Sequence, residues 1–194
     1  MTPERRQKLL AVISKRQNDL AVVLENVFDP HNVSAIMRTC DAVGVQELYV
    51  VNTRIPLHKK YGFKSSRSAN KWVTVHQYSD AAECFAEVKK YYATILTTRL
   101  SHDAVGLYDM NFIGSIALVF GNEVYGVSDE VQQYADGSFV IPQVGMIESL
   151  NISVACAVTL YEVFRQRSLA GHYEQASLAG DKLDRVYNDW GLKE

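Results

Sequence analysis

The sequence predicts an α/β fold in which a parallel sheet carries helices on both faces. Short apolar segments of strand length alternate along the chain with longer segments of helical periodicity, an order typical of parallel sheets. The 194 residues contain no internal repeat and no low-complexity linker, which indicates a single domain that can bury a sizeable core. Ligands of such sheets bind where the strands end, so the loops after the strands are the first place to look for a site.

Local start and stop signals place the helices. Thr2 suits the cap and Pro3 the first turn of an N-terminal helix. Gly44 is a stop signal for the second helix, and Ser79 is expected to cap the third. The polar tail carries an apolar stripe at helical spacing that can dock on a neighbouring element. We expect helices at residues 2–18, 32–43, 79–92, 128–135 and 149–167, and a helical tail at 171–194.

The strands are short apolar runs between these helices. The run from Ile116 to Phe120 is the most apolar of them, as a strand buried on both faces should be. We expect strands at residues 21–27, 48–51, 72–75, 94–98, 116–120 and 139–141.

Composition and cysteine usage are those of an ordinary soluble protein, with 47% hydrophobic and 22% charged residues. The N-terminal segment is charged rather than apolar, so we expect no signal peptide, and we expect no membrane span. Cys40, Cys84 and Cys156 lie far apart in helical patterns, which favours small buried residues in a reducing cytoplasm. Without CxxC or HExxH spacing we expect no metal site.

The charged residues are unevenly distributed along the chain, although the formal net charge is only −2. Between Leu48 and Ser79 there is no acidic residue, and aromatic residues are interspersed with basic ones, a pattern that can grip phosphates and stack on bases. The alternative is a solvated loop that lacks acids. The basic residues of this window are Arg54, Lys59, Lys60, Lys64, Arg67 and Lys71.

The segment IPQVGMIESLNISVACA, residues 141–157, is the most informative in the chain. Pro142 and Gly145 interrupt an apolar run, which suits a loop that approaches a ligand closely better than it suits a core strand. Ser149 stands where the cap of the following helix is expected, and the unpaired N–H groups of a helix start can hold a polar ligand. The alternative is an ordinary strand–turn–helix connection.

Two more loops carry polar residues directly after apolar strands. The segment ENVFDPHNVSAIMRTCDAVG, residues 25–44, contains Asn32 and Arg38. Taken alone, Asn32 can be explained as a helix cap and Arg38 as a solvated charge. In LVFGNEVYGVSDE, residues 118–130, the glycines match neither a dinucleotide fingerprint nor a P-loop. Asn122 and Glu123 follow a buried strand, where a site explains them better than folding does.

Taken together, N-x5-R, FGNE-x2-G and IPQVGM-x2-SLN resemble the SpoU (TrmH) branch of the SPOUT RNA 2′-O-ribose methyltransferases. The resemblance runs from about Arg5 to Arg167 and is closest to the members that methylate guanosine 18 of tRNA. It implies a single SPOUT domain over 1–194, with a C-terminal trefoil knot in which the segment after Ile141 threads a loop near Phe120. It further implies a homodimer that binds tRNA. Methylation of another tRNA position or of ribosomal RNA stays open.

The resemblance also implies the site residues. S-adenosyl-L-methionine would be held by Thr98, Gly121, Ile141 and Leu150, with Met146 alongside. Arg38 would remove the proton of the ribose hydroxyl or position that hydroxyl and a phosphate, and Asn32 would orient Arg38 or the ribose. Glu123 would hold an arginine or the cofactor. Ser149 and Asn151 would order the cofactor loop, and Arg165 and Arg167 would contact tRNA phosphates.

Two other classes of function remain. A catalytically silent RNA-binding module on the same fold is disfavoured by the intact polar residues of the three motifs. A small-molecule α/β enzyme, such as a nucleotide-binding transferase, is disfavoured by the missing phosphate loops and by the basic window.

Overall fold

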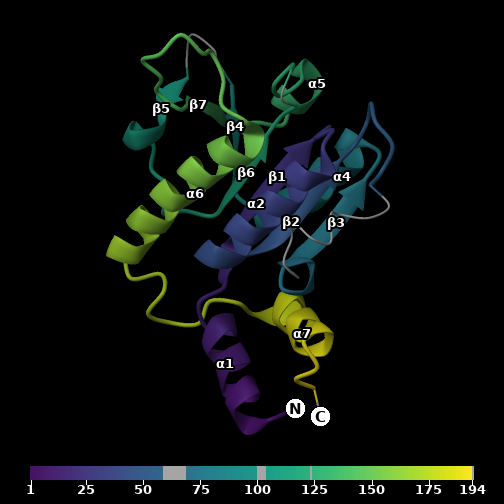
Figure 1. Cartoon of the computed structure of the whole chain (residues 1–194), viewed down its shortest axis with the longest axis vertical. Coiled ribbons are helices and arrows are strands. Elements are labelled where there is room, and N and C mark those ends of the chain that lie inside the picture. The colour runs from purple at the N-terminus through teal and green to yellow at the C-terminus, as the bar shows by residue number, and fades with distance from the viewer. Residues whose placement is uncertain (59–68, 100–103, 123, 194) are drawn as a thin grey trace.

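The computed structural model describes residues 1–58, 69–99, 104–122 and 124–193 and contains one parallel seven-stranded sheet (Figure 1). Every neighbouring pair of strands is parallel, in the order β3-β2-β1-β6-β4-β7-β5. The strands are β1 (Gln17–Glu25), β2 (Val45–Val51), β3 (Thr74–Tyr78), β4 (Thr94–Thr98), β5 (Val105–Gly106), β6 (Ile116–Phe120) and β7 (Gly137–Val140). The predicted α/β class is confirmed.

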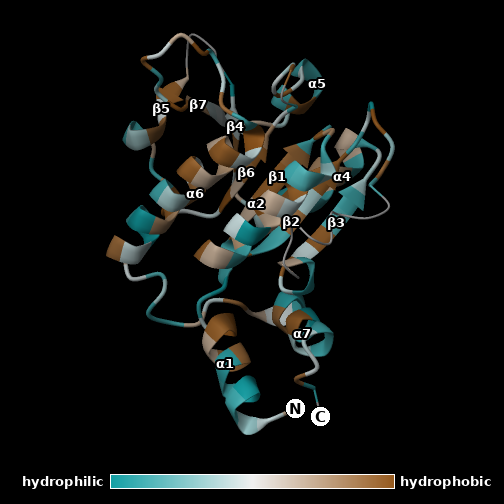
Figure 2. Ribbon diagram, viewed as in Figure 1, coloured by the Kyte–Doolittle hydropathy of each residue, from teal (hydrophilic) through white to brown (hydrophobic). Residues whose placement is uncertain are grey.

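Helices cover both faces of the sheet. They are α1 (Pro3–Ile13), α2 (Pro30–Val43), α4 (Ala81–Tyr91), α5 (Asp129–Gln132), α6 (Ile152–Leu169) and α7 (Gly180–Asp189), with short 3-10 turns η1 (Ala69–Lys71) and η2 (Leu107–Asp109). Leu20, Val22 and Leu24 of β1 pack in the core beneath α2 and α6, whereas Ala21 and Val23 pack on the opposite face against α4. Burial on both faces explains why residues 20–24 of β1 and all of β6 are hydrophobic (Figure 2).

Several predicted boundaries are confirmed by their caps. The side chain of Thr2 accepts a hydrogen bond from the backbone of Arg5, and Ser128 caps α5. Gly44 ends α2 in the left-handed conformation, with φ of 85°. Two caps were predicted wrongly. Asp80, not Ser79, caps α4, and Asn151, not Ser149, caps α6.

The C-terminal tail docks on the N-terminal helix, and both chain ends lie at the same end of the molecule (Figure 1). Leu9 and Ile13 of α1 form a separate cluster with Val186 and Trp190 of the tail. The guanidinium of Arg16 lies 5.3 Å from the centroid of the Trp190 ring, a cation–π contact that supports the docking. The apolar stripe of the tail therefore packs on a neighbouring element, as predicted.

The three cysteines are buried, as predicted, in α2, α4 and α6. Burial raises the pKa of Cys40 and of Cys84 to about 12, so neither thiol is a nucleophile at neutral pH. Among the described residues, no helix is long and apolar enough to cross a membrane, and no group of His, Cys, Asp or Glu side chains is placed to hold a metal ion.

Candidate functional site

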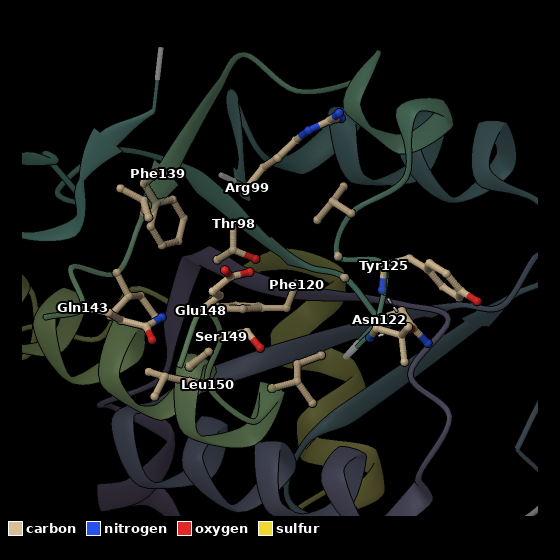
Figure 3. A pocket seen from close by; sticks show the side chains of 18 residues that line it. Thr98, Arg99, Phe120, Asn122, Tyr125, Phe139, Gln143, Glu148, Ser149 and Leu150 are labelled. Carbon is tan, nitrogen blue, oxygen red and sulfur yellow. Dashed lines mark hydrogen bonds between the residues drawn. The ribbon is translucent and has the colours of Figure 1, made fainter. Parts of the chain in front are cut away.

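A cavity of about 440 Å³ opens where β4, β6 and β7 end (Figure 3). Phe120 and Phe139 form apolar walls from two of these strands, and Leu150 closes the cavity from the loop that precedes α6. Thr98 lies at the end of β4, where its hydroxyl donates to the carbonyl of Val119 at 3.2 Å. The site therefore lies at the carboxyl edge of the sheet, as expected of a parallel fold.

The loop after β6 folds into a tight turn against this cavity. Asn122 and Gly126 exchange backbone hydrogen bonds of 3.0 and 2.8 Å, and Gly126 has φ of 66°. A Cβ atom on Gly121 would lie 2.0 Å from the backbone carbon of Gly126 and 2.1 Å from the nitrogen of Val127. Only glycine fits at residue 121, because both obstructing atoms belong to the backbone.

Asn122 ties this turn to the loop after β1. Its Nδ2 donates to the carbonyl of Asn26 at 2.8 Å, and its Oδ1 accepts from the backbone of Val124 at the same distance. Asn26 has φ of 50°, unusual for a residue other than glycine, and its Oδ1 accepts from the backbone of Arg54. Three loops are thus fixed to one another at the edge of the sheet.

Asn26 was not singled out from the sequence, because a left-handed asparagine has no pattern of its own. The one feature of the sequence that could have indicated Asn26 is its position directly after β1, in the loop that leads to Asn32. Asn122, predicted to belong to a site because it follows a buried strand, does line the cavity.

The first and third motifs meet through two asparagines. Nδ2 of Asn151 donates to Oδ1 of Asn32, on the first turn of α2, at 3.3 Å. The same Asn151 caps α6, because its Oδ1 accepts from the backbone of Ser153 at 2.9 Å. Arg38 lies further along α2 with an exposed side chain. Asn32, Arg38 and Asn151 are not part of the cavity wall, whereas Ser149 is.

Of the five residues expected to hold the cofactor, four line the cavity and one does not. Those that line it are Thr98, Gly121, Ile141 and Leu150. Met146 is the exception, since its side chain is 99% exposed and absent from the wall. Gln143, Glu148 and Ser149 of the same exposed stretch do line the cavity, so the loop touches the site on both sides of Met146.

Arg167 is not available to RNA, so its prediction is wrong. Its side chain is fully buried, and its Nη1 forms an ion pair with Asp19 at 2.6 Å. Nε donates to the carbonyl of Phe112 at 3.0 Å, and Nη2 donates to that of Gly114. A basic residue near a helix end resembled a surface charge in the sequence, but this one joins α6 to β1 and to the segment before β6.

Arg165 has an exposed side chain and holds Glu162, with its Nη2 2.7 Å from the carboxylate. This hydrogen bond lowers the pKa of Glu162. Arg54 and Lys71 are also exposed. The remaining predicted site residues, Glu123, Lys59, Lys60, Lys64 and Arg67, lie outside the described residues.

The cavity can hold a small molecule that has both a flat apolar part and polar edges. Gln143 and residues 148–150 line the cavity, and their main-chain groups make no backbone–backbone hydrogen bond with other described residues. These groups are therefore available to a ligand. The walls of Phe120, Phe139 and Leu150 supply apolar contact on either side. Main-chain polar groups between apolar side chains are typical of sites that bind heterocycles.

Comparisons with known proteins agree on one family. A model of the SpoU rRNA Methylase family matches residues 19–161. The tRNA (guanosine(18)-2′-O)-methyltransferase of Thermus thermophilus is 41% identical over 191 residues, which cover 97% of this chain and 96% of the relative.

Two solved structures extend this agreement to the fold. The TrmH/SpoU tRNA modifying enzyme of A. aeolicus superposes with a TM-score of 0.88 at 37% identity, over 97% of this chain and 95% of that one. The SpoU methyltransferase AviRb of Streptomyces viridochromogenes, in complex with the cofactor AdoMet, superposes with a TM-score of 0.71 at 26% identity. That alignment covers 82% of this chain and 62% of the other.

Proposed function

Because the chain belongs to the SpoU rRNA methylase family, we propose that it transfers a methyl group from S-adenosylmethionine to the ribose 2′-hydroxyl of guanosine 18 in tRNA. The proposal rests chiefly on one observation, the 41% identity over almost the whole length to a relative whose name states this reaction. A tRNA substrate also favours a cytoplasmic location.

The described residues fit S-adenosylmethionine. The volume of about 440 Å³ is within the range of small-molecule sites. The apolar walls suit the adenine ring, and the main-chain groups of Gln143 and of residues 148–150 suit its polar edge. When bound, the cofactor supplies a sulfonium methyl group that a hydroxyl can attack, so the protein must orient the hydroxyl and assist the loss of one proton.

We assign contact with the RNA substrate during the reaction to Arg38. It is exposed on α2 and separate from the cavity wall, so it is placed to face the nucleic acid rather than the adenosine. A guanidinium stays protonated in nearly all proteins, and its planar fork suits a phosphate together with a hydroxyl. Arg38 would therefore position the ribose, with loss of the hydroxyl proton late in the reaction.

The two asparagines would hold the geometry between the RNA and the cofactor. Asn32 lies on the same helix as Arg38, and Asn151 fixes Asn32 through a hydrogen bond while capping α6. Ser149 and Leu150, directly before this cap, line the cavity. One hydrogen bond thus joins the helix of the proposed RNA contact to the loop of the proposed cofactor contact.

Family membership further leads us to infer the trefoil knot. Ser149 and Leu150 share a cavity with Phe120 and Gly121, an arrangement that threading of this segment near β6 would produce.

We also infer a homodimer. Exposed apolar side chains gather on α6 and on the loop before it, where a second copy could cover them. They include Val144, Met146, Ile147, Val154 and Tyr161. Sedimentation should give twice the chain mass of 21.8 kDa, and a stable, active monomer would refute the dimer.

The function is tested by incubating the purified protein with methyl-labelled S-adenosylmethionine and an unmodified tRNA transcript. We expect label in tRNA and none in a ribosomal RNA fragment. A silent RNA-binding module would bind tRNA without transferring label, and label only in ribosomal RNA would assign a different substrate.

A further inference from the structure

The cavity wall contains two charged side chains among the described residues, Arg99 and Glu148. They differ in their partners. Arg99 forms an ion pair with Asp129 at 2.8 Å, so its charge is already balanced. Glu148 makes no hydrogen bond and no ion pair with any residue that the structure describes. The unbalanced charge of this wall is therefore negative.

Glu148 is directed at the interior of the site. In Figure 3 its carboxylate points from the loop before α6 toward Thr98, across the ring of Phe120. A carboxylate beside apolar walls attracts a cation more strongly than one in bulk water, because less solvent screens the pair. Glu148 is exposed on this loop, so a ligand that enters the cavity can reach the carboxylate.

We propose that Glu148 binds the positive centre of S-adenosylmethionine and makes the cavity prefer this molecule to its product, S-adenosylhomocysteine. The inference rests on the proposed function. The two molecules share the adenosine and the amino-acid group, and differ in a sulfonium that becomes a neutral thioether when the methyl group leaves. The uncharged residues of the wall interact similarly with both molecules, whereas a carboxylate attracts the sulfonium more strongly than the thioether.

A preference of this kind assists turnover. The product loses the attraction that held the substrate, so it dissociates more readily and competes less with fresh cofactor. The attraction weakens as the positive charge declines during transfer, so it stabilises the bound substrate more than the transition state. Glu148→Gln should accordingly raise KM for the cofactor without lowering kcat.

The test is calorimetric titration of the wild-type protein and of Glu148→Gln with three ligands, S-adenosylmethionine, S-adenosylhomocysteine and sinefungin. Sinefungin carries an amine in place of the sulfonium and is cationic. We expect Glu148→Gln to lower the affinity for S-adenosylmethionine and for sinefungin by about three- to tenfold. The affinity for S-adenosylhomocysteine should not change. Glu148→Asp should retain part of the preference.

Glu130→Gln is the matched control, because it removes an exposed carboxylate on α5 that does not line the cavity. It should leave all three affinities unchanged. Equal weakening of all three ligands by Glu148→Gln would place the carboxylate at their shared amino group and overturn the proposal, as would three unchanged affinities. A wild-type protein that binds none of them would instead refute the proposed function.

Discussion

Asn151 donates a hydrogen bond to Asn32 at 3.3 Å, although 119 residues separate them in the chain. The contact joins the cap of α6 to the first turn of α2. These helices pack together over the same face of the sheet, so the packing of the core fixes the positions of both asparagines. Two motifs that are individually weak in the sequence are therefore one structural unit.

The two roles of Asn151 can be separated by substitution. Serine caps a helix about as well as asparagine but is too short to reach Asn32. Asn151→Ser should therefore keep the free energy of unfolding near the wild-type value and still slow methyl transfer. Asn151→Ala should slow transfer and also destabilise the fold by about 1 kcal/mol. Thermal unfolding and transfer assays check both, and full activity in Asn151→Ser would show that the contact is dispensable.

Gly121→Ala should abolish the cavity, because the added Cβ would collide with the backbone of Gly126 and Val127. Displacing that turn should weaken S-adenosylmethionine binding by about tenfold or more. Gly114→Ala is the control, since a Cβ there meets no atom within 4 Å and Gly114 does not line the cavity. Titration of both variants checks the prediction, which fails if Gly121→Ala binds the cofactor normally.

Arg38→Ala should abolish methyl transfer while leaving the affinity for S-adenosylmethionine nearly unchanged, because Arg38 is not part of the cavity wall. Arg38→Lys should fail as well, since a point charge cannot replace the planar fork. Calorimetry and single-turnover transfer measure the two effects. Loss of cofactor binding in a folded Arg38→Ala protein would contradict the assignment to the RNA side.

Arg167→Ala should destabilise the protein by about 3–5 kcal/mol, because it removes a fully buried guanidinium and leaves Asp19 and the carbonyls of Phe112 and Gly114 without this donor. Arg165→Ala, from the same helix but exposed, should cost less than about 1 kcal/mol. Denaturant unfolding compares the two. A stable Arg167→Ala protein that had lost only tRNA affinity would restore the RNA-contact prediction.

Replacing Lys59, Lys60, Lys64 and Arg67 by alanine should weaken tRNA binding. Each lost phosphate contact should flatten the logarithmic salt dependence by about 0.7 to 0.9, so the quadruple variant should lose roughly two to four units of slope. Cofactor affinity should not change. Titrations at several salt concentrations decide the matter, because a solvated loop without RNA contacts predicts an unaltered slope.

The sequence was most informative where local rules operate. Thr2 and Gly44 mark helix ends through chemistry that depends on a few neighbouring residues, and both were predicted correctly. Membership of the SpoU family, inferred from three motifs in register, is confirmed. Ser149 was mistaken for a cap because serine and asparagine cap equally well, and only the path of the loop selects Asn151.

Features that depend on distant contacts could not be read from the chain. The burial of Arg167 follows from Asp19, which is 148 residues away. The left-handed Asn26 is stabilised by Asn122 from another loop. The direction in which the Glu148 side chain points likewise depends on where the loop before α6 lies relative to Thr98 and Phe120, which are distant in the sequence.

The most direct test of the account is to map the methylated nucleotide in an in vitro tRNA transcript. The transcript is treated with the protein and S-adenosylmethionine, digested with nuclease, and analysed by mass spectrometry. We predict a single 2′-O-methylguanosine at position 18, and a transcript carrying a 2′-deoxyguanosine there should remain unmodified. A methyl group on a base, at another nucleotide, or on no nucleotide at all would contradict the central claim.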